Sequence, residues 1–357
     1  MNTPVLDFHR PGVLEATRPP EDRGLVRDEV RLLVSSPSGH EHARFRDLAA
    51  FLPRGAVLVV NRSATLPASL PARGRLGPFR VNVSTEYGRG LWLIEPRMDH
   101  AVPGPLPVRE GEVVEVAGTP CRLLAPFPGI PRLWFLRASE DLRGRMRRAG
   151  EPIRYGYMEA PFPGIEAYRT LFSSRPGSAE MPSAARPFTP RVVSRLLDKE
   201  IRIASVVLHT GVSSLEFDTN DAGAPLLFPE PFEVPEATAE VLNRAREEGR
   251  PVIVVGTSSL RALESARLGE RIRPASGFTR RFIHPGEPAV SVDGLITGLH
   301  EPRSSHLALL LGMAGSELVR AGYREAIREG YLWHEFGDSH LILNRARRSR
   351  KPFHASH

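Results

Sequence analysis

Short apolar runs rich in β-branched residues recur along the chain and end in small polar or titratable residues. Residues 56–60 (AVLVV), 206–208 (VVL) and 252–255 (VIVV) are such runs, and residues 294–297 (GLIT) form a fourth. This composition and length predict strands that are buried on both faces of a sheet. The third run leads through Gly256 into apolar residues at helical spacing, which predicts a strand–turn–helix unit. Together these features predict an α/β sheet.

Helical periodicity appears in three segments after residue 185. Residues 190–199 place four apolar side chains on one face of a predicted helix. Residues 235–249 have a proline near their start and a glycine at their end, which are preferred end signals of a helix. Residues 307–331 form a long amphipathic segment that glycines interrupt. Strands and helices thus alternate in this half of the chain.

The pattern changes between residues 71 and 150, where short apolar runs alternate with glycine- and proline-rich turns. Repeated short strands at this spacing predict a small antiparallel barrel or sandwich. We therefore predict a large mixed α/β domain, formed by residues 1–70 and 151–343, with a small antiparallel β-barrel inserted at residues 71–150. The runs that predict its strands are residues 79–83, 91–94, 113–116, 122–124 and 133–136.

Length and charge limit the class of protein. The chain has 357 residues, which is enough for a full core and two domains. Its formal net charge of +7 includes five basic residues and no acid in residues 344–357, so the rest of the chain carries only +2. We predict that this segment is a disordered basic tail, which could attract phosphates without specificity.

The cysteine content and the apolar stretches indicate the cellular location of the protein. The single cysteine, Cys121, excludes an internal disulfide and fits a reducing compartment. Residues 1–12 lack the apolar core of a signal peptide, and the longest apolar stretch, residues 307–315, is too short to span a bilayer. We therefore expect a cytoplasmic protein without a membrane segment.

Polar residues follow the predicted strands at the edge where α/β sheets bind ligands. His209 and His300 each follow a strand, and each could be a catalyst or a hydrogen-bonded core histidine. The turn at Gly256 could hold an anion or a polar ligand edge, although plain N-capping by its serines would explain the same residues. The residues of these turns that we expect near a ligand are Thr210, Gly211, Gly256, Thr257, Ser258 and Ser259.

Three further segments carry candidate chemistry. Residues 177–189 form an irregular loop of small residues and prolines, which is typical of a segment close to a ligand. Arg261 and Glu264 lie one helical turn apart, so a local ion pair is the alternative to binding. Residues 334–340 (HEFGDSH) lack a recognised zinc spacing, so we expect no metal and favour Asp338 as a ligand or structural carboxylate.

Fragments spread along the chain match a known family in their order and spacing. They are Arg27-Asp28, Leu58 to Asn61, Pro67-Ala68, Tyr168 to Phe172, Gly177-Ser178, Pro182, Ala184, Phe188-Thr189, Leu208-His209, Gly211, Val255-Gly256-Thr257, Arg261, Leu263-Glu264, His300, Pro302, Ser304 and Gly337-Asp338. In this order they resemble the S-adenosylmethionine:tRNA ribosyltransferase-isomerase family of queuosine synthesis. The resemblance covers nearly the whole chain.

The resemblance implies a fold and a reaction. The family's architecture, a large α/β domain with an inserted β-barrel, agrees with the pattern above. Its reaction transfers and isomerises the ribosyl group of S-adenosylmethionine onto an aminomethyl-deazaguanine base of tRNA. The product is epoxyqueuosine-tRNA, and adenine and methionine are released. We expect no metal or organic cofactor, because the sulfonium of the co-substrate supplies the activation, and we expect a monomer.

The resemblance also suggests roles for the candidate residues. Removing a proton beside the sulfonium suits a base of near-neutral pKa, so we assign His209, His300 and Asp338 to catalysis. Adenine, as the leaving group, needs hydrogen-bond donors that meet its developing charge. The turn at Gly256 or Arg186 could supply them. Arg261 and Glu264 could bind the methionine end. The remaining residues assigned to substrate binding are Pro182, Ser183, Phe188, Thr210, Gly211 and Ser304.

Several departures from the family pattern leave the acceptor open. Residues 182–188 (PSAARPF) replace the family's PTAGLHF and lack its histidine, and residues 61–64 (NRSA) lack its arginine. Residues 335–338 (EFGD) replace SYGD. Two alternatives follow: the same donor chemistry on a small-molecule acceptor, or a protein that binds S-adenosylmethionine or RNA without turnover.

Overall fold

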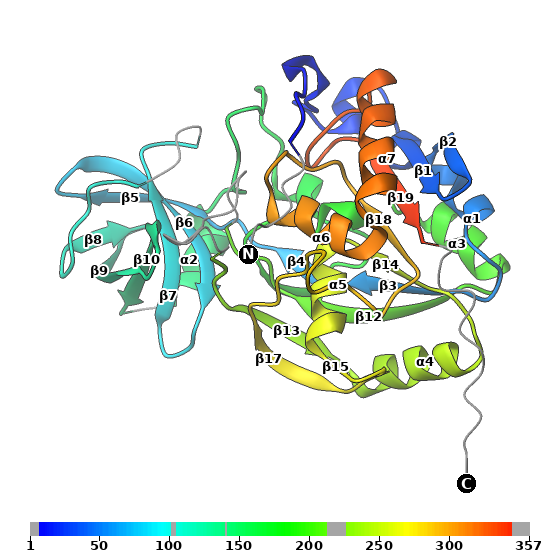
Figure 1. Ribbon diagram of the computed structural model, residues 1–357. Helices are drawn as coiled ribbons and strands as arrows, with labels where there is room; N and C mark the ends of the chain where they lie inside the picture. Colours follow the sequence, from blue (N-terminus) through cyan, green and yellow to red (C-terminus); the bar gives the residue numbers. More distant parts are fainter. Residues whose placement is uncertain (1–6, 101–104, 140, 213–225, 345–357) are drawn as a thin grey trace, which may run out of the picture.

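The computed structural model describes residues 7–100, 105–139, 141–212 and 226–344. It shows a large mixed α/β domain with a closed antiparallel β-barrel at one end (Figure 1), which confirms the predicted fold class. Most of the predicted basic tail, residues 345–357, lies outside the described residues.

A nine-stranded sheet forms the centre of the large domain, in the order β17-β13-β12-β3-β14-β18-β19-β1-β2. Its four central strands are parallel: β12 (Arg202–Leu208), β3 (Val57–Asn61), β14 (Val252–Val255) and β18 (Gly294–Thr297). β19 (Ser339–Leu343) runs antiparallel to β18, so it starts at the edge where β18 ends. The other strands of this sheet are β1 (Arg31–Ser36), β2 (Gly39–Arg44), β13 (Glu230–Val234) and β17 (Ala275–Thr279).

Helices cover both faces of this sheet. Val57 and Val59 of β3 face one core, and Leu58 and Val60 face the other. Burial on both sides is why the central strands are continuously apolar. One face carries α4 (Glu236–Glu247), α5 (Thr257–Ser265), α6 (Ser305–Ala314) and α7 (Ser316–Arg328), and the other carries α1 (Leu48–Phe51) and α3 (Pro190–Asp198).

Six antiparallel strands close the barrel in the order β10-β7-β6-β5-β8-β9. Helix α2 (Leu142–Ala149) follows the last strand and buries Leu142 and Met146 against the barrel core. Ser69 and Glu151 exchange two backbone hydrogen bonds of 2.9 Å, so the chain enters and leaves the barrel side by side. The strands are β5 (Ser69–Gly74), β6 (Gly77–Glu86), β7 (Leu91–Arg97), β8 (Val113–Val116), β9 (Thr119–Phe127) and β10 (Ile130–Ala138).

Short elements complete the fold. Two small two-stranded sheets pair β4 (Ser63–Thr65) with β11 (Arg175–Ser178) and β15 (Arg267–Leu268) with β16 (Arg271–Ile272). Six 3₁₀ turns lie at Gly12–Leu14, Pro20–Arg23, Arg27–Glu29, Phe45–Asp47, Ile165–Tyr168 and Ser183–Ala185.

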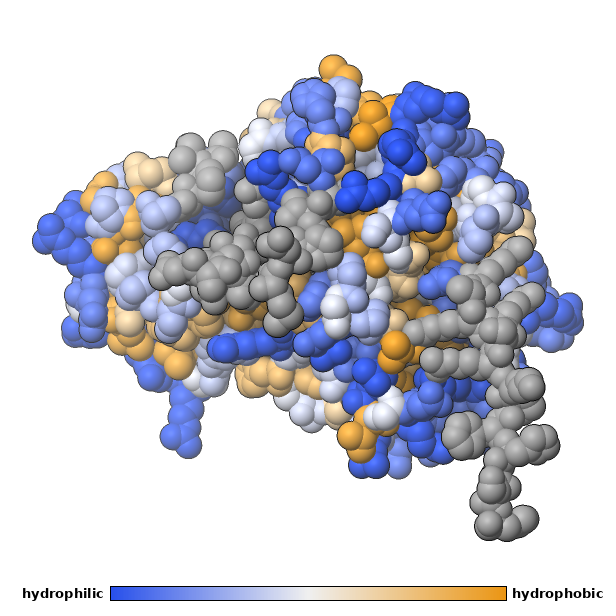
Figure 2. Space-filling model, viewed as in Figure 1, coloured by the Kyte–Doolittle hydropathy of each residue, from blue (hydrophilic) through white to orange (hydrophobic). Residues whose placement is uncertain are grey.

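The amphipathic segment at residues 307–331, which glycines interrupt, forms two helices. Gly315, with φ +82°, separates α6 from α7, a backbone conformation that glycine adopts without strain. None of the helices in the described ranges is both long and apolar enough to cross a bilayer. Figure 2 shows hydrophilic residues over the visible face of both domains, with apolar residues in smaller groups between them.

Candidate active site

An open cavity of about 970 Å³ lies where the central parallel strands end. Its wall includes the turns after β14 and β18, the loop at residues 180–184, and residues 334–335 ahead of β19. Tyr155 and Tyr157, from the segment after the barrel, complete it. Eight of the residues predicted to contact a ligand line this cavity: Pro182, Ser183, Thr210, Gly256, Thr257, Ser258, His300 and Ser304.

Asn61, the last residue of β3, fixes the strand ends beneath the cavity. Its Nδ2 donates to the Leu208 carbonyl oxygen (2.8 Å) and to the Ser258 hydroxyl (3.0 Å). Its Oδ1 accepts from the backbone N–H groups of Leu208 (3.1 Å) and Ser63 (3.0 Å). Because this buried side chain joins three segments, it sets the position of Ser258 relative to the end of β12.

Two helices begin at the cavity. Gly256, with φ +86°, turns the chain from β14 into α5, whose first residues Thr257 and Ser258 line the wall. Ser304 caps α6, since its hydroxyl accepts from the Leu307 N–H (3.2 Å). The N-terminus of a helix carries unpaired N–H groups and a partial positive charge. This side of the cavity therefore suits a carboxylate.

Neutral histidines lie beside these helix starts. His300 hydrogen-bonds through Nε2 to the Thr297 hydroxyl (2.7 Å) and stacks on His306, with the ring centres 4.8 Å apart. Burial lowers the pKa of His300 well below its ordinary value and lowers that of His306 to about 4. Both rings are therefore uncharged at neutral pH.

Two carboxyl groups and two tyrosines form what we call the acidic corner of the cavity: Glu180, Glu335, Tyr155 and Tyr157. The Tyr157 hydroxyl donates to Glu335 (3.1 Å), and the Tyr155 hydroxyl donates to Glu180. Tyr157 also stacks on His334, with ring centres 4.0 Å apart. Burial, together with the nearby Glu180, raises the pKa of Glu335 to about 8. At neutral pH the Glu335 carboxyl is therefore mostly protonated.

His209 lies next to the cavity wall rather than in it. Its Nδ1 hydrogen-bonds to the Ser63 hydroxyl (2.7 Å), and a Cβ on Gly177 would lie 2.5 Å from its ring. Burial, helped by Arg143 and Arg175, lowers its pKa to about 4. The imidazole thus fills the space between β12 and the loop after β11, and only the following residue, Thr210, reaches the cavity.

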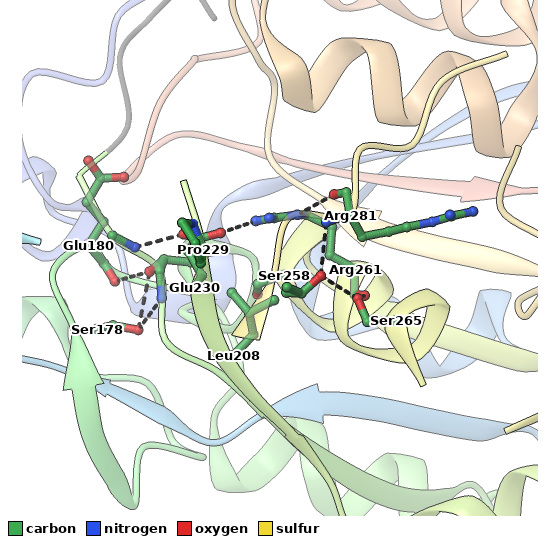
Figure 3. Close-up of polar contacts among 12 residues, drawn as sticks. Ser178, Glu180, Leu208, Pro229, Glu230, Ser258, Arg261, Ser265 and Arg281 are labelled. Atoms are coloured by element: carbon green, nitrogen blue, oxygen red, sulfur yellow. Dashed lines mark hydrogen bonds and ion pairs between the residues drawn. The ribbon is translucent and has the colours of Figure 1, made fainter. Parts of the chain in front are cut away.

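The predicted alternative for Arg261 and Glu264, a local ion pair, is wrong. Arg261 pairs with Glu230 and donates to the Arg281 carbonyl oxygen (3.0 Å), as Figure 3 shows. Glu264 instead accepts from the backbone N–H groups of Val290 (2.7 Å) and Ser291 (2.8 Å) and from the Arg267 guanidinium (2.8 Å). Both side chains therefore hold loops together, outside the cavity wall.

Gly211 and Ser259 also have partners in the protein. The Gly211 N–H donates to Glu230 (2.8 Å), and a Cβ at this position would collide with Phe228. Ser259 is buried and donates to the carbonyl oxygen of Val255 (2.6 Å), the last residue of β14. Neither residue lines the cavity.

The three remaining candidates are buried beside the cavity. Arg186 donates to the Ala167 carbonyl oxygen and pairs with Glu21, both at 2.8 Å. Phe188 packs in the core between Phe45 and Phe172. Asp338 accepts the Arg31 N–H (2.7 Å) and the Leu332 N–H (2.8 Å), so its carboxylate joins β1 to the loop before β19.

Several cavity residues were not predicted from the sequence. Tyr155, Tyr157 and His306 stand in segments without a recognisable motif, and the fold alone brings them together. Glu180 belongs to the loop at residues 177–189 that we expected near a ligand, but it was not singled out there. His334 and Glu335 belong to a segment noted for its titratable residues, but the chain there is a loop and β19 begins only at Ser339. Within the described ranges, no group of three or more His, Cys, Asp or Glu side chains is placed to hold a metal ion.

Comparisons with known proteins agree with one another. The family model described as "Queuosine biosynthesis protein" matches residues 3–342. The chain is 39% identical to the S-adenosylmethionine:tRNA ribosyltransferase-isomerase of Rubrobacter xylanophilus, over 98% of this chain and 100% of that protein. It is 36% identical to the enzyme of the same name from Thermus thermophilus, over 89% of this chain and 93% of that protein. The crystal structure of S-adenosylmethionine tRNA ribosyltransferase from Thermotoga maritima superposes with a TM-score of 0.52 at 28% identity. The match covers 94% of this chain and 99% of that chain.

Proposed function

This chain belongs to the queuosine biosynthesis protein family, and on that premise we propose that the cavity is the active site of an S-adenosylmethionine:tRNA ribosyltransferase-isomerase. The enzyme transfers and isomerises the ribosyl group of S-adenosylmethionine onto the aminomethyl-deazaguanine base of tRNA. Adenine and methionine are released. The comparisons give no support to a small-molecule acceptor or to a protein without turnover.

The observation that carries this proposal is the charge of the cavity. Among the described residues that line it there are three glutamates and no arginine or lysine, although the chain as a whole carries +7. Glu335 is mostly protonated and Glu301 pairs with Arg10, so the wall carries little net charge, and no arginine or lysine among its described residues repels a cationic ligand. S-adenosylmethionine carries a sulfonium and an ammonium against one carboxylate, so its net charge is positive.

We place the methionine carboxylate at the starts of α5 and α6. Thr257, Ser258 and Ser304 lie there, and the helix N-termini supply N–H donors and a favourable field. This replaces the assignment of the methionine end to Arg261 and Glu264, which are engaged elsewhere. The protein itself needs no oxidant, metal or organic cofactor for this chemistry, because the sulfonium acidifies the adjacent C–H bond.

We assign the first proton transfer to His300. Its ring lines the cavity, is neutral at physiological pH, and is oriented by the Thr297 hydroxyl. A positioned base of this kind takes the proton from the ribose carbon beside the sulfonium, which permits loss of adenine from the same sugar. We further propose that the enzyme acts as a cytoplasmic monomer.

The test is release of adenine from labelled S-adenosylmethionine, followed by chromatography, with and without tRNA that carries the aminomethyl-deazaguanine base. We expect adenine and methionine to form in equal amounts only when this tRNA is present. Equal turnover without tRNA would point to a different acceptor. Absence of adenine under either condition, with folded protein, would contradict the proposed function.

A further inference from the structure

The acidic corner has no role in the donor chemistry assigned above, yet it faces the same cavity. Resting on the proposed function, we propose that Glu180 and Glu335 bind the ammonium form of the acceptor's aminomethyl group and that Glu335 takes one proton from it. The pair would thus select a base that carries a primary amine and convert that amine into a nucleophile.

The surroundings of Glu335 favour a cationic partner. Glu301, the third glutamate of the cavity, already pairs with the Arg10 guanidinium (3.0 Å). The partner of Glu335 is the neutral phenol of Tyr157. A buried carboxyl held beside a second carboxyl is costly unless a positive group completes the site. An alkylammonium, with three N–H donors, could reach both carboxyl groups at once.

The position of the acidic corner favours the acceptor over the donor. Tyr155 and Tyr157 belong to the segment that leaves the barrel, and Glu180 follows β11. These segments are separate from the starts of α5 and α6, to which we assign the donor carboxylate. Both tyrosines donate to the carboxyl oxygens. These contacts, and the stacking of Tyr157 on His334, hold the pair in a fixed orientation before substrate arrives.

The proton transfer balances within the site. Glu335 is mostly protonated before substrate binds, and binding of the ammonium displaces that proton to solvent. The resulting carboxylate takes H⁺ from R–NH₃⁺; one N–H bond breaks, one O–H bond forms, and R–NH₂ keeps the electron pair that attacks the ribosyl carbon. Glutamate ordinarily has a pKa of about 4.3 and an alkylammonium one of about 10. Because burial and Glu180 raise the pKa of Glu335 to about 8, the two groups are closely matched for transfer.

The first experiment compares two RNA probes. Anticodon stem-loops carrying the deazaguanine base with either an aminomethyl group or a nitrile are titrated into wild-type enzyme, Glu335→Gln and Glu180→Gln. We expect wild type to prefer the amine by about 10- to 100-fold, the range of a hydrogen bond to a charged group. Both variants should bind the two probes within a few-fold of each other. Glu301→Gln, whose carboxylate faces Arg10, is the matched control and should retain the preference.

The affinity for S-adenosylmethionine, measured in the absence of RNA, shows whether Glu335 recognises the acceptor or the donor. We expect its Kd in Glu335→Gln to stay within about twofold of wild type. If this variant loses donor affinity, or weakens both stem-loops equally, the pair does not recognise the amine and the inference is overturned. An active wild type with no preference between the probes would overturn it too, while leaving the proposed function standing.

A pH series of thermal unfolding tests whether Glu335 is simply structural. Glu180, Tyr157, Tyr168, Arg186 and His334 surround it, and its folded-state pKa of about 8 lies above the ordinary value. The folded protein therefore binds an extra proton, so Glu335 reduces stability progressively as the pH rises from about 5 to 8. We expect Glu335→Gln to have a higher Tm than wild type at pH 8, with a smaller difference at pH 5. A lower Tm at pH 8 would show a structural role and contradict the proposal.

Discussion

Replacing His300 with alanine is expected to slow adenine release by a factor of about 10²–10⁴, the usual contribution of a positioned acid or base. The imidazole is neutral because burial lowers its pKa, and Thr297 and His306 hold its ring at the cavity. Affinity for S-adenosylmethionine should change little, because the helix starts hold the donor's carboxylate. Single-turnover assays with saturating donor and modified tRNA would measure this loss.

His209→Ala is the matched comparison, since His209 follows the neighbouring strand and was the other histidine predicted as the base. Its ring contacts Ser63 and Gly177 and does not line the cavity, so we expect a loss of less than about tenfold, well below that of a positioned base. If His209→Ala abolishes turnover and His300→Ala does not, our assignment of the base to His300 is wrong.

Gly337→Ala is expected to lower the free energy of unfolding by about 1–3 kcal/mol or more, the cost of forcing an atom into packed space. A Cβ at this position would lie 2.5 Å from the Trp333 carbonyl oxygen and would also collide with that of Leu332. Both are backbone atoms of the loop that carries His334 and Glu335, so the loop itself must move. Adenine release should therefore fall together with stability.

Chemical denaturation and the adenine assay measure the two effects of Gly337→Ala. Gly164→Ala is the control, because no atom lies within 4 Å of a Cβ there and its φ of −73° suits alanine. We expect this control to behave like wild type. A Gly337→Ala protein with wild-type stability and activity would show that the loop adapts freely and that its geometry does not define the site.

The sequence predicted the sheet well because its signal is local. The β-branched runs that became β3, β12, β14 and β18 are buried on both faces, and a strand of this kind shows no alternation. The barrel was visible as repeated short strands for a similar reason. The bend of the loop from His334 to Asp338 could not be predicted, because Asp338 holds it through the backbone N–H groups of nearby Leu332 and of Arg31, 307 residues away.

The site was predicted in part. Thr257, Ser258, Ser304 and His300 follow strands or begin helices, so topology alone brings them to one edge. The acidic corner could not be found this way, because Tyr157 and Glu335 are 178 residues apart and meet only through tertiary packing. The sequence also could not show that Arg261 would pair with Glu230 on β13 rather than one turn along its own helix.

The departures from the family pattern acquire a physical meaning in this fold. Arg186, in the loop that lacks the family's histidine, ties the Ala167 carbonyl to Glu21 and faces the Phe336 ring at 4.8 Å. Ser63 bonds both His209 and Ser178. Arg186 and Ser63 therefore support the cavity wall, whereas Glu335, a further departure, lines the cavity itself. The helix starts and His300 remain.

The most direct test of the account is a crystal structure of the enzyme with S-adenosylmethionine bound. We predict that the donor occupies the cavity at the ends of β14 and β18. Its carboxylate should lie within hydrogen-bonding distance of the first residues of α5 or α6, and its sulfonium should lie beside His300. A donor bound elsewhere, with this cavity empty, would contradict the account.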